Sequence, residues 1–109
     1  MISDEHSDFK SLITEARLPS LLALRCFESA GRLENFARAA DELHLTPGAI
    51  SRAVRLLEED LGVDLFERRN RRVFLTDAGK RLVKAVSEGL GLMNQAVREI
   101  RTDARRTRQ

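Results

Sequence analysis

Hydrophobic side chains recur at helical spacing in several separate stretches of the chain, which predicts a mainly helical protein. The first stretch is residues 8–17, where an apolar face permits a short amphipathic helix formed around Phe9, Leu12, Ile13 and Ala16. Pro19 ends this stretch, because proline cannot continue a helix. We therefore interpret residues 1–17 as an N-terminal extension in front of the folded domain.

Two more helices are predicted between residues 20 and 43. Ser20 is a helix-capping residue type, and the pattern after it places Leu21, Leu24 and Phe27 on one face. We expect Gly31 to end this helix, because glycine is common just past a helix C-terminus. Asn35 caps the next helix, whose predicted buried side consists of Phe36, Ala39, Ala40 and Leu43.

A further helix begins at Thr46 and Pro47, an N-cap followed by a first-turn proline, and Gly62 ends it after Leu61. The connection before it is so short that the two helices must cross steeply, which small side chains such as Ala39 permit. This is the pattern of a helix-turn-helix, which places its second helix in the major groove of DNA. A purely structural three-helix bundle is the alternative interpretation.

The predicted helix 47–61 has two unlike faces. Its inward face consists of Ile50, Val54, Leu57 and Leu61. The opposite face carries no carboxylate and consists of Gly48, Ser51, Arg52 and Arg55. The acids of this helix are confined to its C-terminal end, at Glu58, Glu59 and Asp60. This polarity favours a recognition helix over an ordinary solvated face, since acids in the major groove would meet phosphates.

Two short β-prone segments, 65–68 and 73–75, predict a hairpin. Its turn is Arg69-Asn70-Arg71, where asparagine tolerates a positive φ. Four arginines crowd this hairpin: Arg68, Arg69, Arg71 and Arg72. Folding does not require such crowding of like charges, whereas a phosphate backbone or a narrow minor groove would relieve it. A solubilising run of charge is the alternative.

A long helix is predicted from Thr76 and Asp77 to about Arg101, with residues 102–109 as a flexible tail. One apolar stripe of this helix consists of Leu82, Val86, Leu90, Met93, Val97 and Ile100. A second stripe adjoins it, at Ala85, Gly89, Leu92 and Ala96. A helix that packs only on its own domain needs one stripe, so two stripes indicate a homodimer through residues 77–101. A frayed helix with a glycine bend is the alternative.

The order of these elements defines the fold class: a mainly α, winged helix-turn-helix domain over residues 18–76, followed by a long C-terminal dimerisation helix. The formal net charge of +2 is modest, so the basic hairpin stands out as a local nucleic-acid footprint. No glycine-rich phosphate loop and no nucleophile–base pairing stands out, which argues against an enzyme.

The single cysteine excludes a disulfide within the chain, and with only two histidines beside it we expect neither a metal site nor a cofactor. Cys26 is expected to be a core thiol rather than a redox sensor, and His44 a capping or surface residue. No apolar run is long enough to span a membrane, and the acidic N-terminus differs from a secretory signal. We therefore expect a cytoplasmic protein.

Residues 18–82 resemble the N-terminal domain of LysR-type transcriptional regulators almost throughout. The resemblance rests on FARAADELHLT, AISRAVRLLEEDLGVDLFER and the closing LTDAG, in this order and spacing. It implies a bacterial transcription factor that binds an interrupted palindrome of double-stranded DNA as a dimer or tetramer, at the nucleoid. It also implies a C-terminal domain that senses a small-molecule effector, which we expect to lie outside these 109 residues.

The resemblance also assigns roles by position. The base and phosphate contacts of the family fall on Thr46, Pro47, Gly48, Ser51 and Arg52, with Arg38 on the phosphate side and Arg68 and Arg71 in the wing. Asn35, Arg55, Arg69 and Arg72 complete our set of candidate DNA-binding residues.

Two positions depart from the common pattern of the family. Pro47-Gly48 replaces the frequent Gln-Pro and removes an amide that reads adenine, and Gly48 would let the backbone come close to DNA. Ala37 stands where Ser or Thr is common and cannot donate to a phosphate. The rival function is a winged-helix module that binds protein instead of DNA.

Overall fold

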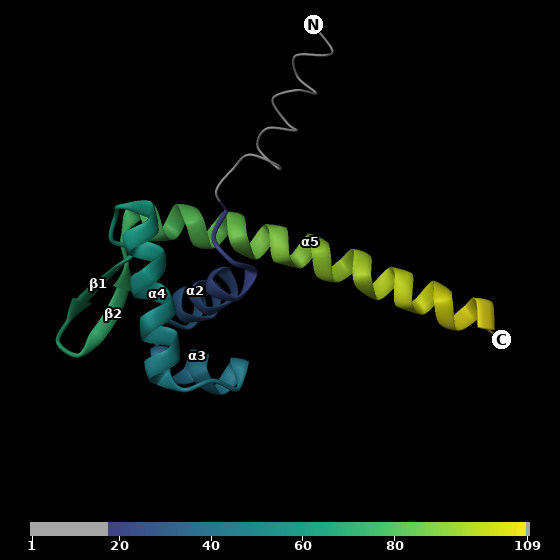
Figure 1. The fold of residues 1–109 in the computed structure, drawn as a ribbon, viewed down its shortest axis with the longest axis horizontal. Coiled ribbons are helices and arrows are strands. Elements are labelled where there is room, and N and C mark those ends of the chain that lie inside the picture. Colours follow the sequence, from purple (N-terminus) through teal and green to yellow (C-terminus); the bar gives the residue numbers. More distant parts are fainter. Residues whose placement is uncertain (1–17, 109) are drawn as a thin grey trace, which may run out of the picture.

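The computed structural model describes residues 18–108, and the short helix predicted within residues 8–17 lies outside them. The described part is mainly helical, with one two-stranded antiparallel sheet. Its elements in chain order are α2 (Leu21–Leu33), α3 (Phe36–Leu43), α4 (Pro47–Leu61), β1 (Phe66–Arg69), β2 (Arg72–Leu75) and α5 (Asp77–Arg108) (Figure 1). The predicted winged helix-turn-helix followed by a long helix is confirmed.

The core lies where α2, α3 and α4 meet the start of the hairpin. Its largest fully buried side chains are those of Phe27, Ile50, Leu57, Leu65 and Val54. Phe66, the first residue of β1, inserts between two helical aromatics. Its ring centroid lies 5.7 Å from that of Phe27 and 5.4 Å from that of Phe36, both in edge-to-face geometry. The hairpin is thus anchored in the helical core.

Three predicted N-caps are confirmed. The side-chain oxygens of Ser20, Asn35 and Thr46 accept hydrogen bonds from backbone N–H groups three residues ahead, at 3.1, 2.9 and 3.1 Å. Each bond satisfies one of the unpaired donors of a helix N-terminus. At the other end, His44 and Gly62 follow α3 and α4 in the left-handed conformation.

The predicted stop at Gly31 is wrong. Gly31 is buried inside α2, which continues to Leu33 and is followed by Glu34 in the left-handed conformation, with φ of 47°. The reason for glycine here is space rather than backbone freedom. A Cβ at Gly31 would lie 3.1 Å from Cγ2 of Val83 on α5. Gly31 therefore lies where α2 and α5 cross.

The hairpin pairs Phe66 with Leu75 and Arg69 with Arg72, one residue further along in β1 than the predicted segment 65–68. Its turn holds Asn70 and Arg71, both at positive φ, 52° and 64°. Left-handed values at both central residues give the turn a twist that suits a two-residue hairpin. The predicted hairpin is therefore confirmed, but its turn is shorter than predicted, because Arg69 belongs to β1 and pairs with Arg72.

The long helix extends beyond its predicted end. We expected a helix to about Arg101 and a flexible tail at 102–109, but α5 continues to Arg108. Residues 102–108 contain neither glycine nor proline, and three of the seven are arginine, which is a strong helix former. At 1.5 Å per residue, the 32 residues of α5 extend about 48 Å. Among residues 18–108, no helix combines the length and the hydropathy that a membrane span requires.

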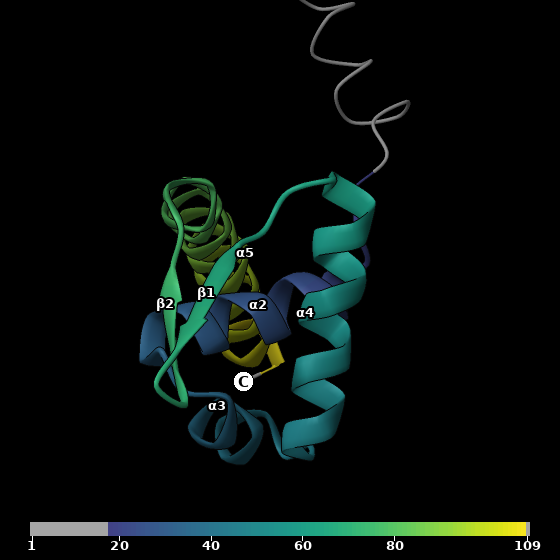
Figure 2. The same ribbon diagram turned by 90° about the vertical axis from the view of Figure 1, so that its left-hand side faces the viewer.

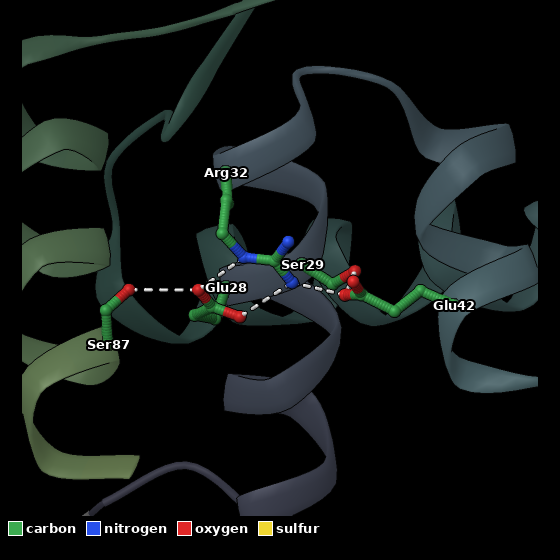
Figure 3. A network of polar contacts seen from close by, with 5 residues as sticks. All are labelled: Glu28, Ser29, Arg32, Glu42 and Ser87. Carbon is green, nitrogen blue, oxygen red and sulfur yellow. Dashed lines mark hydrogen bonds and ion pairs between the residues drawn. The ribbon is translucent and has the colours of Figure 1, made fainter. Parts of the chain in front are cut away.

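A polar network joins α5 to α2 and α3 (Figure 3). Glu28 of α2 accepts a 3.0 Å hydrogen bond from Ser87 of α5 and pairs with Arg32 at 3.0 Å. Arg32 also pairs with Glu42 of α3, which accepts a hydrogen bond from the buried hydroxyl of Ser29. These bonds, the one from Arg32 first, hold the pKa of Glu42 below its usual range. The network is charged and partly exposed, so it orients the three helices more than it stabilises them.

Gly79, near the start of α5, has the least room for a side chain among the described glycines. A Cβ built on it would lie 2.2 Å from the carbonyl oxygen of Leu65 and 2.9 Å from Cδ2 of Leu75. The carbonyl belongs to backbone and cannot rotate away. Because Thr76 caps α5 while its hydroxyl donates to the carbonyl of Asp64 at 2.8 Å, the start of this helix cannot shift freely.

We therefore expect Gly79→Ala to destabilise the fold by about 3 kcal/mol or more, since the added methyl overlaps rigid backbone. Urea unfolding followed by circular dichroism measures this loss. Gly91→Ala is the matched control, because a Cβ there meets nothing within 4 Å and should leave stability equal or higher. Equal stability of Gly79→Ala and the parent would contradict the contact.

Candidate DNA-binding surface

The N-terminal turn of α4 is open to solvent. Thr46, Pro47 and Gly48 are all exposed, and the side chain of Thr46 caps the helix through the N–H of Ala49. A Cβ on Gly48 would meet no atom of the chain within 4 Å, and its φ is not positive. The fold therefore places no demand for glycine at this position. Backbone N–H groups at a helix N-terminus also attract anions such as phosphates.

The outer face of α4 continues this open surface. Arg52 and Arg55 are exposed and make none of the ion pairs found among the described residues, and Ser51 is half-buried beside them. The predicted inward face is confirmed for Ile50, Val54 and Leu57, but Leu61 is 43% exposed. The last turn of α4 extends past the helical core, so the side chain of Leu61 is not buried as the apolar pattern predicted.

Glu58 connects α4 to the hairpin, a structural role that the sequence analysis did not predict. Its carboxylate accepts hydrogen bonds from the backbone N–H groups of Leu65 and Phe66, at 2.7 and 3.3 Å. The side chain is thereby turned toward the start of the hairpin. A carboxylate near the end of a helix, eight residues before a strand, was the available signal. The outward face of α4 remains free of acids up to this point.

The start of α3 contributes two of the candidate residues. The side-chain oxygen of Asn35 is occupied by the N–H of Arg38, so Asn35 positions the helix end more than it offers an acceptor. The side chain of Arg38 is exposed and makes no ion pair among the described residues. The hairpin turn and the N-terminal end of α4 reach toward the same end of the molecule as α3 (Figure 2).

The four wing arginines are not equivalent. Arg68 lies over the ring of Phe36, 5.4 Å from its centroid. Arg69 and Arg72 lie over the ring of Phe74, at 5.0 and 5.7 Å, and Arg69 also pairs with Glu67 at 3.5 Å. Aromatic rings under guanidinium groups restrict their motion and lower their mutual repulsion.

Arg71 differs from the other three. It occupies the turn itself, with its backbone left-handed, and no ring or carboxylate contact was found for it among residues 18–108. The position of the Phe74 ring beside Arg69 and Arg72 could have been predicted from the sequence. In an antiparallel hairpin directly opposed residues share a face, which places Glu67, Arg69, Arg72 and Phe74 together.

A cleft separates α4 from the wing, and its charge is mixed. Its walls carry Arg55, Arg68 and Arg69 together with the carboxylates of Glu58, Asp64 and Glu67. The basic character predicted for the wing therefore belongs to its turn and outer face. An anionic partner would find fewer opposing charges at the tips of α4 and the hairpin than in the cleft between them.

The apolar stripe of α5 changes character along the helix. Leu82, Val86 and Leu90 are half-buried and line a groove with Leu18, Leu21 and Leu24. Met93 lies at the end of the groove and is 51% exposed, and beyond it Val97 and Ile100 are 41% and 67% exposed. Leu92, of the second stripe, is 69% exposed. Half of α5 thus projects from the domain with its apolar side chains in solvent (Figure 1).

Cys26 and His44 have the locations expected of them. Cys26 is buried in the core, and burial raises the pKa of its thiol above the ordinary value. His44 is exposed and follows α3 as its C-terminal capping residue. Neither residue adds chemistry to the surface described above.

Comparison with known proteins explains this combination of a helix-turn-helix, a wing and a long helix. Residues 21–80 match the sequence model described as "Bacterial regulatory helix-turn-helix protein, lysR family". The chain is 52% identical over 84 residues to the HTH-type transcriptional regulator TrpI of Pseudomonas aeruginosa, covering 77% of this chain and 28% of that protein. It is 44% identical over 86 residues to the glycine cleavage system transcriptional activator homolog of Haemophilus influenzae, covering 79% and 29%.

Solved structures agree with the sequence matches. The chain superposes on the BenM DBD in complex with catB site 1 DNA with a TM-score of 0.72, at 31% identity, covering 79% of this chain and 96% of that one. It superposes on the CbnR DBD–DNA complex with a TM-score of 0.68, at 32% identity, covering 79% and 99%. The chain spans less than a third of the length of these curated relatives, which are transcriptional regulators and not enzymes. The chain belongs to the LysR family of bacterial regulators, and its helix-turn-helix is a DNA-binding module of that family.

Proposed function

We propose that this chain binds a specific sequence of double-stranded DNA as a homodimer, with α4 in the major groove of each half-site. The exposed, carboxylate-free face of α4, running from Thr46 to Arg55, is the observation that carries the proposal. Arg52 and Arg55 have no ion-pair partner within the described residues and can reach base edges. An arginine donates in a bidentate manner to guanine, which is the commonest specific contact in the major groove.

Phosphate contacts would fix the register of α4 on the duplex. The open N-terminus of α4 and the exposed side chain of Arg38 on α3 are suited to this role. In the wing, Arg68, Arg69 and Arg72 are held on aromatic rings and would contact the backbone. Arg71, which extends from the turn without such support, would contact the phosphates that flank the adjacent minor groove.

The dimer would form through α5, with Met93, Val97 and Ile100 against a second copy. Apolar side chains this exposed on a projecting helix are typical of an interaction surface. Two modules on one rigid pair of helices would recognise an interrupted palindrome, because two-fold symmetry places two recognition helices on one face of the duplex. Family membership supports a tetramer and a small-molecule effector for the full-length regulator, which would act on nucleoid DNA in the cytoplasm.

Arg52→Ala tests the recognition face. We expect it to cost about 1–3 kcal/mol on the specific site and to relax the choice of base at one position, because it removes a direct contact. Arg71→Ala should instead weaken all duplexes alike and reduce the salt slope by about one phosphate contact. A site selected from a random duplex pool, followed by anisotropy titrations at several salt concentrations, measures both.

Arg98→Ala is the matched control for these two variants, since Arg98 is exposed on α5 away from the proposed surface. It should bind like the parent. If Arg52→Ala and Arg71→Ala also bind like the parent, α4 and the wing do not face DNA. If the parent itself shows negligible duplex affinity at low salt, the proposal fails, and the rival function, a winged-helix module that binds protein, is favoured.

Gly48→Ala tests whether glycine at this position is required for DNA binding rather than for folding. Alanine should leave stability unchanged or raise it by up to about 1 kcal/mol, because its Cβ meets nothing and glycine is the weaker helix former. We expect DNA affinity to fall nevertheless, since the methyl would separate the backbone from the groove. Denaturant unfolding and anisotropy on the selected site measure the two effects. Unchanged affinity would show that no close backbone approach occurs there.

Val97→Asp tests the dimer without touching the folded core, because Val97 lies beyond the groove that α5 forms with α2. We expect sedimentation equilibrium to show monomers at concentrations where the parent is a dimer. Gln95→Asp adds the same charge off the stripe and should leave the dimer intact. A parent that stays monomeric at high micromolar concentration would refute the α5 dimer.

A further inference from the structure

Phe74 is an aromatic residue on the outer face of the wing. Side chains of a strand alternate between two faces, and the neighbours of Phe74 in β2, Val73 and Leu75, pack against the helical core. Within residues 18–108, Phe74 belongs neither to the buried core nor to the partly buried apolar side chains packed against it. Its own side chain is half-buried. Packing of the helical core therefore does not account for an aromatic ring at this position.

The ring of Phe74 has two arginines as neighbours. The guanidinium carbon of Arg69 lies 5.0 Å from the ring centroid, and that of Arg72 lies 5.7 Å from it. Arg69 pairs directly with Arg72 in the hairpin, and Phe74 follows two residues later on the same strand and face. Two like charges that oppose each other across a hairpin are destabilising. The ring attracts both guanidinium groups and offsets this repulsion.

Glu67 also lies on this face, opposite Phe74, and pairs with Arg69 at 3.5 Å. A carboxylate that attracts an arginine also repels a phosphate, so this ion pair opposes a contact with DNA. An aromatic ring carries no net charge and attracts a guanidinium through its planar face. The N–H donors at the edge of the guanidinium stay free. An arginine stacked on Phe74 can therefore donate to a phosphate at the same time.

We propose that Phe74 is a positioning residue for DNA binding, whose ring holds Arg69 and Arg72 in the orientation in which they meet phosphates. This role rests on the proposed function, in which the wing contacts the DNA backbone. A free arginine side chain loses rotamer entropy when it binds, and one that is already stacked on a ring loses less. Phe74 thus raises the affinity for every duplex alike, without contacting DNA and without changing the choice of base.

Phe74→Val tests this role, because valine removes the ring and keeps a side chain that favours strands. We expect a urea midpoint close to that of the parent and an affinity for duplex DNA that is about threefold to tenfold weaker. Phe74→Tyr keeps the ring and should bind like the parent. Fluorescence anisotropy on a labelled duplex measures the affinities, and Phe74→Leu is a second variant without a ring.

A double-mutant cycle separates positioning of the arginines from a general structural role. In a chain that carries Arg69→Ala and Arg72→Ala, the ring has no guanidinium group to hold. Adding Phe74→Val to this chain should therefore cause no further loss of affinity. An equal loss with and without the two arginines would show that Phe74 acts on the fold of the wing, and would overturn the inference.

Failure of DNA binding and failure of positioning by Phe74 give different results. Negligible affinity of the parent for any duplex contradicts the proposed function. If loss of Arg69 and Arg72 weakens binding while Phe74→Val and Phe74→Leu bind like the parent, the wing contacts DNA and Phe74 does not position it. Parent-like binding without the two arginines overturns the positioning role too, and so does a Phe74→Tyr variant as weak as Phe74→Val.

Discussion

The backbone at Leu65 and Phe66 is the junction on which the rest of the structure depends. Glu58 of α4 accepts the N–H groups of both residues, and Gly79 of α5 lies so close to the carbonyl of Leu65 that no Cβ fits. The ring of Phe66 is anchored between aromatics of α2 and α3. Leu75 of β2 pairs with Phe66, so every element of the described part meets these two consecutive residues, and the wing and α4 are held in one fixed relation.

This rigidity matters because the proposed DNA surface is built from separate elements. The exposed face of α4 carries arginines that have no partner in the described part, whereas the wing arginines rest on Phe36 and Phe74. Like charges can be gathered at one hairpin because the rings hold three of them and Glu67 partly neutralises one. The resulting surface is ordered before any partner arrives, which lowers the entropic cost of binding.

The long helix divides into two parts with different environments. Its first turns pack on the domain through Gly31, Val83 and the bond from Ser87 to Glu28, which links α5 through Arg32 to α3. Within residues 18–108 its second half is exposed and presents an apolar stripe to solvent. The direction in which α5 leaves the domain is therefore determined by the helical core. In a dimer, that direction sets the separation of the two recognition helices.

The sequence by itself determined the features that depend on local interactions. The caps at Ser20, Asn35 and Thr46, the Asn70 turn and the exposed face of α4 follow from side-chain chemistry and the 3.6-residue period. Local propensity also permits the helix at residues 102–108, which contain neither glycine nor proline, so the predicted flexible tail is wrong. Only the tertiary structure decided that Gly31 is a crossing point, that Glu58 anchors the wing, that Leu61 is uncovered and that Arg71 stands apart from its three neighbours. These features depend on contacts between residues distant in sequence, and no local pattern specifies which side chains will meet.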